Sequence, residues 1–491
     1  MSTIELDKTI PASESARDPH AKLTLSFGSR TQFEVFADTM ERLFDVVTVA
    51  SATLTSYYVY EFLNVGKHVH YSLKSVSAFA CFCALVFMLL LENSGAYRRA
   101  NSLMRIRETE RILKVSFQVV GLIFPLTFFS ASLFSRGILL VGAVLTPTVL
   151  IAEKQIFFFI IEQLHLRSRG IRKVIIYGAG HSGKRLFSVL VRSTKLGLYP
   201  VAIVDDNPEL QGIHIYESGY KRKHSTAVTH GPLTAELIRR LEASTVIVAI
   251  PSLSRSRLDA IASQVNKAGA IMAFVPQVTE NLELIGEYAD IDGLLIAYSG
   301  QTPPSYGYAS FKRAFDFVVA SLLLGIIAPL WGLISLLIRL DSPGPVLFEQ
   351  LRVGEGGSLF KIFKFRTMKT NAPRYGYHPT DSEDPRLTKF GSWLRRTSLD
   401  ELPQLLNVIK GEMSLVGPRP EMPFIVETYQ RIHRQRLEVI PGITGLWQLS
   451  ADRAFPIHEN IQCDLYYIRN RNFFMDVAIL LHTFLFAMRG I

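Results

Sequence analysis

Hydrophobic residues gather in four long segments within the first third of the chain, near residues 43–62, 76–91, 112–134 and 137–161. A helix that crosses the apolar core of a bilayer needs about 20 mostly apolar residues. The second segment is short, and the fourth contains Glu153 and Lys154. The pattern predicts a four-span transmembrane bundle over residues 43–165, which follows a polar, disordered cytoplasmic tail over residues 1–42.

Basic residues between these segments predict the orientation of the bundle. Between the second and third segments and after the fourth lie Arg98, Arg99, Arg105, Arg107, Arg111, Arg167, Arg169, Arg172 and Lys173. The opposite loops carry only Lys67, Lys74 and Arg136. Because basic loops stay on the cytoplasmic side, both ends of the bundle are expected there.

Short buried-type strands then alternate with helical stretches over residues 166–297. Examples are KVIIY, PVAIV and STVIVAI. This alternation is typical of a parallel, doubly wound sheet and predicts a Rossmann-like α/β domain.

Gly178, Gly180 and Gly183 follow the first of these strands in a G-x-G-x-x-G pattern, and Asp205 ends the next strand. This context is typical of a nucleotide-binding fold, but a glycine turn also simply joins a strand tightly to a helix. Nucleotide binding is therefore left open, and no cofactor-binding residue is assigned. Arg185 stands where a P-loop would carry a Ser or Thr, which excludes that motif.

A Gly-, Pro- and Ser-rich linker over residues 298–310 precedes a strongly apolar stretch over residues 314–338. Pro329 lies near its middle, and basic residues flank both ends. Proline interrupts the helical hydrogen-bond ladder. We therefore predict a re-entrant membrane helix with both ends cytoplasmic, and the alternative is a fifth span with a kink. The later apolar run, residues 477–488, is too short to span.

Composition agrees with a membrane protein. The 491 residues are 48% hydrophobic and 20% charged, with a net charge of +10 and a sequence pI of about 9.4. A positive chain suits anionic lipid and anionic nucleotides. Since no helix or repeat is dominated by Lys or Arg, nucleic acid is not expected as a partner. Three cysteines, two of them within an apolar run, do not indicate a disulfide framework or a zinc site.

The stretch RRTSLDELPQLLNVIKGEMSLVGPRP, residues 395–420, carries the candidate chemistry. It sets adjacent carboxylates, Asp400 and Glu401, between the arginine pair at 395–396 and Arg419. Carboxylates bind divalent metals, and arginines bind phosphate oxygens. The combination predicts a site for a phosphorylated substrate with Mg²⁺.

Helix capping is the plainer interpretation of the same stretch, since Ser398 and Glu401 spell a capping box. Pro403 would then fall inside the helix. A helix that starts at Asp400 avoids this conflict and presents its positive end to a phosphate.

From residue 311 to 491 the chain resembles the bacterial sugar transferase family, the monotopic phosphoglycosyl transferases. The motifs that carry the resemblance are KRAFDF, EQLRVG, FKFRTM, the stretch at residues 395–420, PGITGLWQLS and CDLYYIRN. The resemblance implies a mostly α-helical (α+β) monotopic catalytic domain. The preceding bundle and Rossmann-like unit resemble the large form of this family.

The resemblance implies transfer of a hexose 1-phosphate from a UDP-hexose to undecaprenyl phosphate, with Mg²⁺ and release of UMP. This step would prime exopolysaccharide, capsule or O-antigen synthesis on the cytoplasmic face of the bacterial inner membrane. Asp400 is the implied nucleophile, which forms an aspartyl-phosphosugar, and Glu401 assists at the metal or in proton transfer. Asp464 matches a third acid at the metal. The phosphate or uridine contacts are expected to be Lys364, Arg366, Arg395, Arg419 and Arg453.

Two other functions remain open at this point. A nucleotide-sugar oxidoreductase would use the Rossmann-like unit, and Tyr308 and Lys312 have the spacing of its Tyr-x-x-x-Lys pair. A non-catalytic membrane scaffold is the third hypothesis. The transferred sugar, the polymer and any homo-oligomer are not readable from the sequence.

Overall fold

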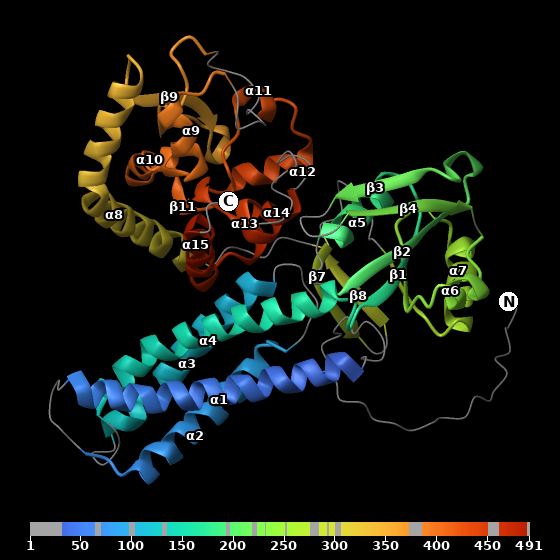
Figure 1. The fold of residues 1–491 in the computed structure, drawn as a ribbon, viewed down its shortest axis with the longest axis horizontal. Coiled ribbons are helices and arrows are strands. Elements are labelled where there is room, and N and C mark those ends of the chain that lie inside the picture. Colours follow the sequence, from blue (N-terminus) through green and yellow to red (C-terminus); the bar gives the residue numbers. More distant parts are fainter. Residues whose placement is uncertain are drawn as a thin grey trace, which may run out of the picture.

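Four long helices at the front of the chain pack against one another (Figure 1). The structure is a computed structural model, and it describes residues 32–63, 70–97, 104–129, 135–192, 197–218, 223–230, 232–250, 253–274, 284–291, 294–299, 306–372, 385–449 and 461–488. The four helices are α1 (Gln32–Leu63), α2 (Leu73–Asn93), α3 (Met104–Phe129) and α4 (Arg136–Leu166). Residues 32–42 are therefore helical, which corrects the tail predicted to end at residue 42, and residues 1–31 lie outside the described residues.

A buried ion cluster explains why α1 begins so early. Lys154 of α4 is 1% exposed, and its Nζ lies 2.8 Å from Glu41 Oε1 and 2.8 Å from Asp45 Oδ2. Tyr97 also donates to Asp45 Oδ2, at 2.7 Å. A buried charge is tolerated only when it is paired and hydrogen-bonded. The acidic face of α1 thus packs against Lys154 of α4, although the sequence at the start of α1 resembles that of a solvated tail.

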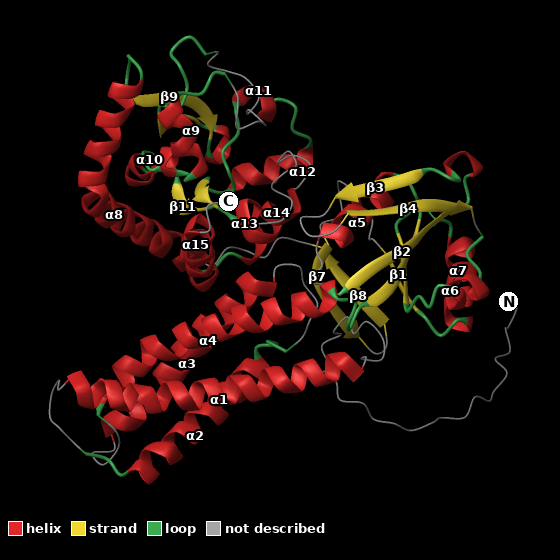
Figure 2. Ribbon diagram, in the orientation of Figure 1, coloured by secondary structure: helices red, strands yellow, loops and turns green. Residues whose placement is uncertain are grey.

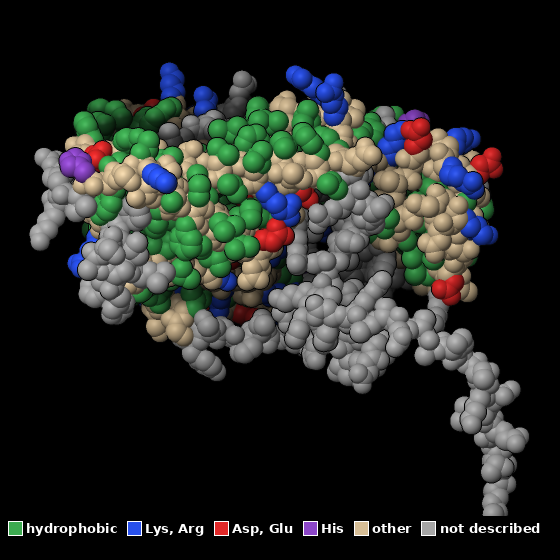
Figure 3. Space-filling view, turned by 90° about the horizontal axis from the view of Figure 1, so that it is seen from below, with side chains coloured by type: hydrophobic (Ala, Val, Ile, Leu, Met, Phe, Trp, Pro, Cys, Tyr) green, Lys and Arg blue, Asp and Glu red, His purple; other side chains and the backbone are tan. Residues whose placement is uncertain are grey.

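Three helices are long and apolar enough to cross a membrane, within the residues that the structure describes: 73–93, 136–166 and 307–341. The helices α1 and α3 do not meet these criteria. Seen from below, hydrophobic side chains cover a broad area that few charged side chains interrupt (Figure 3). Exposed apolar side chains on the front helices include Phe62 at 86% and Val144 at 70%, as expected of a surface that faces lipid.

The middle of the chain forms a six-stranded sheet in the order β3-β4-β2-β1-β5-β6, parallel except for β3 (Figure 2). Its central strand β1 is buried on both faces, as an almost continuous apolar strand requires. This arrangement confirms the predicted Rossmann-like region. Its elements are β1 (Arg172–Tyr177), α5 (His181–Arg192), β2 (Leu198–Asp205), η2 (Pro208–Leu210), β3 (His214–Ser218), β4 (Lys223–His230), α6 (Ala235–Arg240), β5 (Thr245–Val248), α7 (Arg255–Lys267) and β6 (Ile271–Phe274), followed by a hairpin of β7 (Leu284–Ile291) and β8 (Leu294–Ser299).

The long helix α8 (Tyr306–Asp341) continues through Pro329 and bends near its middle (Figure 1). Its N-terminal half buries Ala320 in one cluster of the C-terminal domain, and its C-terminal half buries Ile334 and Ile338 in another. The opposite face exposes large apolar side chains, among them Ile326 at 73% and Leu340 at 74%. Both halves of α8 therefore pack on the same domain, and the outer face remains available to lipid.

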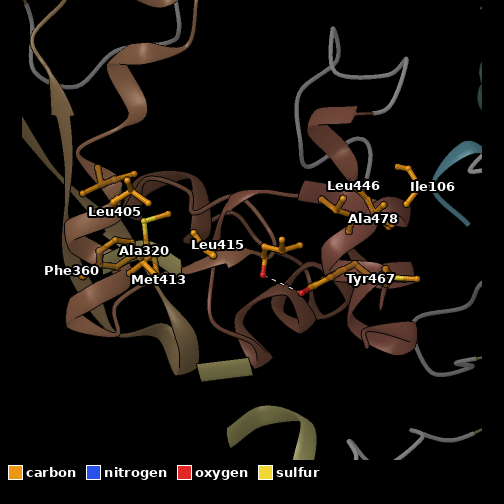
Figure 4. Close-up of a cluster of buried hydrophobic side chains, with 14 residues drawn as sticks. Ile106, Ala320, Phe360, Leu405, Met413, Leu415, Leu446, Tyr467 and Ala478 are labelled. Carbon is orange, nitrogen blue, oxygen red and sulfur yellow. Dashed lines mark hydrogen bonds between the residues drawn. The ribbon is translucent and has the colours of Figure 1, made fainter. Parts of the chain in front are cut away.

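Short elements complete the C-terminal domain, and its core joins α8 to α10, β11, α14 and α15 (Figure 4). These elements are β9 (Leu347–Val353), η3 (Glu355–Gly357), β10 (Leu359–Phe365), α9 (Lys389–Arg396), η4 (Leu399–Glu401), α10 (Gln404–Lys410), β11 (Ser414–Val416), α11 (Pro423–Val426), α12 (Arg431–Arg434), η5 (Gln435–Glu438), β12 (Gly442–Thr444), α13 (Leu446–Leu449), α14 (Ile461–Asn470) and α15 (Phe473–Met488).

The front half contacts this domain through α3. Ile106 is 7% exposed and belongs to the same core cluster as Leu446 and Ala478 (Figure 4). Thr109 Oγ1 lies 2.9 Å from His482 Nε2, and Asn472 Nδ2 donates to Glu110 Oε1 at 2.8 Å. The helix α3 thus completes the core of the C-terminal domain.

Replacing Ile106 by alanine is expected to destabilise the C-terminal domain by about 2–4 kcal/mol, because it leaves a cavity in a shared core. Thermal unfolding of the full chain in detergent measures the loss. Leu122→Ala, at a position 48% exposed on the same helix, is the matched control. Equal stability of the two variants would show that α3 does not support the C-terminal domain.

Candidate active site

The two candidate carboxylates lie in the separate 3-10 turn η4, which precedes α10. Ser398 has φ 56°, in the left-handed region, and makes no side-chain cap bond to η4. Pro403 is the N-cap of α10, whose first residue is Gln404. The helix therefore does not start at Asp400, and the capping box does not form. A non-glycine residue at positive φ stores local strain, which is common where a turn must aim a functional side chain.

Asn407 holds α10, the helix that follows this turn, against β10. Its side chain is fully buried, accepts from Phe363 N at 3.0 Å and donates to Lys361 O at 2.7 Å. Arg313 of α8 donates to the carbonyls of Val408 and Ile409 at the other end of α10. These bonds fix β10, with Lys364, opposite the carboxylates.

Glu401 is ionised and clamped by two cations. Its Oε1 lies 2.7 Å from Lys364 Nζ and 3.1 Å from Arg419 Nη2. Burial alone would raise the pKa of Glu401, but the Lys364 ammonium and then the Arg419 guanidinium outweigh it and hold that pKa well below its usual range. Glu401 thus keeps both cations beside the turn.

Asp400 has a different environment. Its side chain is 8% exposed, and no hydrogen bond to its carboxylate is found among the described residues. Burial raises the pKa of Asp400, Lys364 opposes this rise, and the neighbouring Glu401 charge adds to it. Arg395 and Arg419 also favour the ionised form. Asp400 is therefore a carboxylate with open lone pairs, surrounded by cations.

The remaining predicted contacts divide into two groups. Arg395 is close to the turn and donates from Nε to Thr367 Oγ1 at 2.9 Å. Arg366 instead donates to the carbonyls of Ser342 and Pro343, at the end of α8. In this structure the Arg366 guanidinium therefore caps the end of α8, and its predicted contact with phosphate stays a prediction. Arg453 lies outside the described residues.

Asp464 does not join the two carboxylates, which corrects its assignment as a metal ligand. Its Oδ2 accepts from Arg436 Nε at 2.7 Å, and both side chains are 3% exposed. Arg436 also donates to Arg419 O at 2.9 Å and to the Tyr429 hydroxyl. Sequence reasoning missed Arg436. The one feature of the sequence that could have identified it is its positive charge beside the short apolar run that leads into Pro441.

A Mg²⁺ site at Asp400 and Glu401 fits these observations. No group of three His, Cys, Asp or Glu side chains that could hold a metal is found in the described part of the chain. Mg²⁺ usually binds one or two protein carboxylates and completes its shell with water and substrate phosphates. Asp400 offers its open oxygens, and Glu401 offers Oε2, because both cations contact Oε1.

Tyr308 and Lys312 belong to a different network. Both contact Asp476 Oδ2, and Tyr467 donates to Asp476 Oδ1 at 2.8 Å. Asp476 and Tyr467 are almost fully buried. This network joins α8 to α14 and α15, so the Tyr-x-x-x-Lys spacing reflects helix packing.

Comparison with known proteins agrees with this division of the chain. The family model "Bacterial sugar transferase" matches residues 307–490, and the model "CoA-binding domain" matches residues 92–276. An exopolysaccharide production protein of Rhizobium leguminosarum bv. phaseoli is 42% identical over 184 residues, which are 35% of this chain and 92% of that protein.

Two larger relatives match more of the chain. A UDP-glucose:undecaprenyl-phosphate glucose-1-phosphate transferase of Escherichia coli is 35% identical over 48% of this chain and 53% of that protein. A UDP-N-acetylgalactosamine-undecaprenyl-phosphate N-acetylgalactosaminephosphotransferase of Aeromonas hydrophila is 34% identical over 49% of this chain and 61% of that protein. The matches span little more than half the length of these relatives.

Three findings lead to one assignment: the motifs at residues 312–470, the buried carboxylate pair with its cations, and a relative matched over 92% of its length. The chain belongs to the bacterial sugar transferase family.

Proposed function

We propose that this protein transfers a hexose 1-phosphate from a UDP-hexose to undecaprenyl phosphate and releases UMP, as the priming step of exopolysaccharide, capsule or O-antigen synthesis. The observation that carries this proposal is the Asp400 carboxylate. It is buried, makes no hydrogen bond among the described residues, and lies beside three cations. The two larger relatives named above, which are named as transferases that use a UDP-sugar and undecaprenyl phosphate, support the substrate class.

Asp400 would act as the nucleophile. An oxygen of its carboxylate forms a bond to the phosphorus that carries the sugar, and the bond from that phosphorus to the UMP oxygen breaks, so UMP leaves. A phosphate oxygen of undecaprenyl phosphate then attacks the same phosphorus, and the Asp400 carboxylate is regenerated. A covalent intermediate divides one difficult step into two easier ones.

The surrounding residues would stabilise the charge that develops during transfer. Lys364, Arg395 and Arg419 offer fixed donors to the phosphate oxygens, and fixed donors in a buried site are more effective than donors in water. Mg²⁺, when bound at the carboxylates, would neutralise part of the diphosphate charge. Burial of Asp400 would also keep water from the acylphosphate.

The packing of α8 supports a re-entrant topology. If α8 crossed the bilayer, its two halves would leave the membrane on opposite sides, yet both pack on one domain. We infer that α8 dips into one leaflet of the bacterial inner membrane. The basic loops around the bundle favour the cytoplasmic leaflet, where UDP-sugars are made.

A panel of UDP-hexoses tests the proposal. We expect UMP release that requires undecaprenyl phosphate and Mg²⁺, measured with the full chain in detergent or nanodiscs. Lack of UMP release with every donor would overturn the transferase proposal. A change in nicotinamide absorbance would then favour the oxidoreductase, and its absence would favour the scaffold.

The pH profile of the reaction should depend on Arg395. Only ionised Asp400 can attack, so the rate should fall as the pH drops through the pKa of Asp400, which burial raises. Because Arg395 favours the ionised form, Arg395→Gln should move this acidic limb to higher pH. Arg396→Gln, at the exposed neighbouring position, is the control and should leave the limb in place. A limb that Arg395→Gln leaves unmoved would argue against Asp400 as the titrating group.

A further inference from the structure

A cavity lies between the four front helices, far from the carboxylate pair in sequence. Its lining comes from α1, α2, α3 and α4, and its volume is about 60 Å³. Since one water needs about 10–15 Å³ of such space, the cavity has room for several waters or for a segment of an apolar chain. Protein interiors hold few voids larger than a water molecule. The wall is mostly apolar, which disfavours water as the occupant.

Small side chains on three helices create this space. Ser56 of α1, Ser116 of α3 and Ala143 of α4 line the cavity at points where larger apolar residues would fill it. Gly142 also lines it, and a Cβ added there would meet only Ser56, at 3.6 Å from its Oγ. This is an ordinary contact, so the packing of α1 on α4 does not require glycine at this position. The sequence thus keeps open a space that it could fill.

Ser116 gives the cavity a polar point. It is 5% exposed, and its hydroxyl has no hydrogen-bond partner within the described part of the chain. Thr53 and Ser56 line the same cavity, but their hydroxyls donate to Val49 O and Ala52 O of their own helix. A buried hydroxyl without a partner costs free energy. The hydroxyl of Ser116 therefore remains available to an occupant.

The most exposed part of the lining lies on α3. Val120 and Phe124 line the cavity and are 36% and 39% exposed, whereas its wall on α2, at Cys83 and Phe87, is buried. On α4, Val144 follows the lining residues and is 70% exposed. The cavity therefore opens on the side of the helices that faces lipid.

An apolar stripe on α3 leads from this opening to the C-terminal domain. Its residues recur at intervals of three or four and so share one face of the helix: Leu113, Phe117, Val120 and Phe124. Leu113 packs against the core of the C-terminal domain, and the Phe117 ring lies 5.8 Å from the Phe474 ring of α15. From residue 113 to residue 124 the helix rises about 16 Å. The stripe thus extends the contact between α3 and the C-terminal domain as far as the cavity.

We propose that this stripe and the cavity receive the isoprenoid tail of the polyprenyl phosphate acceptor. The inference rests on the proposed function, in which the phosphate of this lipid reacts in the C-terminal domain. Lipid is as apolar as the cavity wall, so the gain comes from filled space and not from escape from water.

Two arguments favour this tail over the acyl chain of a phospholipid. A tail whose phosphate is bound in the C-terminal domain is held beside the cavity at a high effective concentration, and a free phospholipid is not. The double bonds of an isoprenoid also offer the Ser116 hydroxyl a weak acceptor that a saturated acyl chain lacks.

Photocrosslinking tests where the tail lies. The probe is a polyprenyl phosphate with a diazirine in the distal half of its tail, added to the full chain in nanodiscs without a sugar donor. We expect labelled peptides from α3 and α4 around the cavity, and excess undecaprenyl phosphate should suppress the labelling. A saturated phospholipid with the same diazirine should label these peptides less. Equal labelling by both lipids would show that bulk lipid fills the cavity, against the inference.

Ala143→Leu tests the cavity itself. The larger side chain fills the space, so the KM for undecaprenyl phosphate should rise about fivefold or more while the KM for the sugar donor stays unchanged. Val144→Leu, at the exposed neighbouring position, is the control and should change neither value. Farnesyl phosphate has a tail too short to reach the cavity, so its KM should be the same in the wild type and in Ala143→Leu.

Gly142→Ala keeps the test decisive if the larger leucine disturbs folding. Its single methyl group makes only an ordinary contact with Ser56, so the variant should unfold at the wild-type temperature and show a smaller rise in the same KM. Labelling confined to peptides away from the cavity, or an unchanged KM in both variants, would overturn the inference. Crosslinking needs no transfer reaction, so the tail site and the transferase can fail separately.

Discussion

Asp400→Asn is expected to abolish UMP release without any loss of stability. The rate should fall by roughly 10⁴-fold or more, as is common when a nucleophile is removed. No phosphosugar adduct should be trapped on the variant. The amide is nearly isosteric with the carboxylate but cannot attack phosphorus, so only the chemistry should change.

The stability half of this prediction follows from the environment of Asp400. Burial raises its pKa, which means that the folded state disfavours the ionised form relative to the unfolded state. The free-energy cost of keeping this buried carboxylate ionised in the folded state grows as the pH rises. Replacement by asparagine removes that cost. The unfolding temperature of Asp400→Asn should therefore equal or exceed that of the wild type at neutral pH. An active variant, or an inactive one that is clearly destabilised, would argue against a nucleophile at this position.

Arg436→Met is expected to be both unstable and inactive. Removing one partner of a buried ion pair leaves the other charge without compensation, at a cost of about 3–5 kcal/mol. The carboxylate of Asp464, whose side chain is 3% exposed, would be left in this state. The carbonyl of Arg419 would also lose its donor, so the guanidinium that contacts Glu401 would be less well held.

A double variant separates these two effects. Arg436→Met with Asp464→Leu replaces both charges by apolar groups and should recover much of the lost stability. Its UMP release should remain low, because Arg419 is still unsupported. Full activity in the stable double variant would show that the pair serves folding alone. Denaturant unfolding and UMP release should be measured on the same preparations. Together they show whether the pair serves folding alone or also supports activity.

The carboxylate pair and its nearest cations could be predicted from sequence because they lie in long contiguous motifs. Lys364 and Arg419 both contact Glu401, so the structure brings these predicted residues together at one site. Asp464 and Arg366 lie in motifs of the same kind, yet their side chains bind Arg436 and the end of α8. A motif identifies a residue type at a position, but it does not say which partner the side chain reaches.

The same limit applies to the fold. Alternating apolar segments predicted the parallel sheet correctly, because strands and helices bury their apolar faces locally. The first helix was predicted to begin too late, because Glu41 and Asp45 pair with Lys154, which lies more than a hundred positions later in the chain. Pairing over such a separation has no local signature, so a buried acidic face and a solvated tail have the same composition.

The ion cluster of the bundle also has a consequence for biosynthesis. During translation, Glu41 and Asp45 leave the ribosome well before Lys154 exists. Until that lysine arrives, the carboxylates of the first helix lack the cation that compensates their charge in the folded bundle. The first helix can therefore pack in its final position only after the fourth has been synthesised.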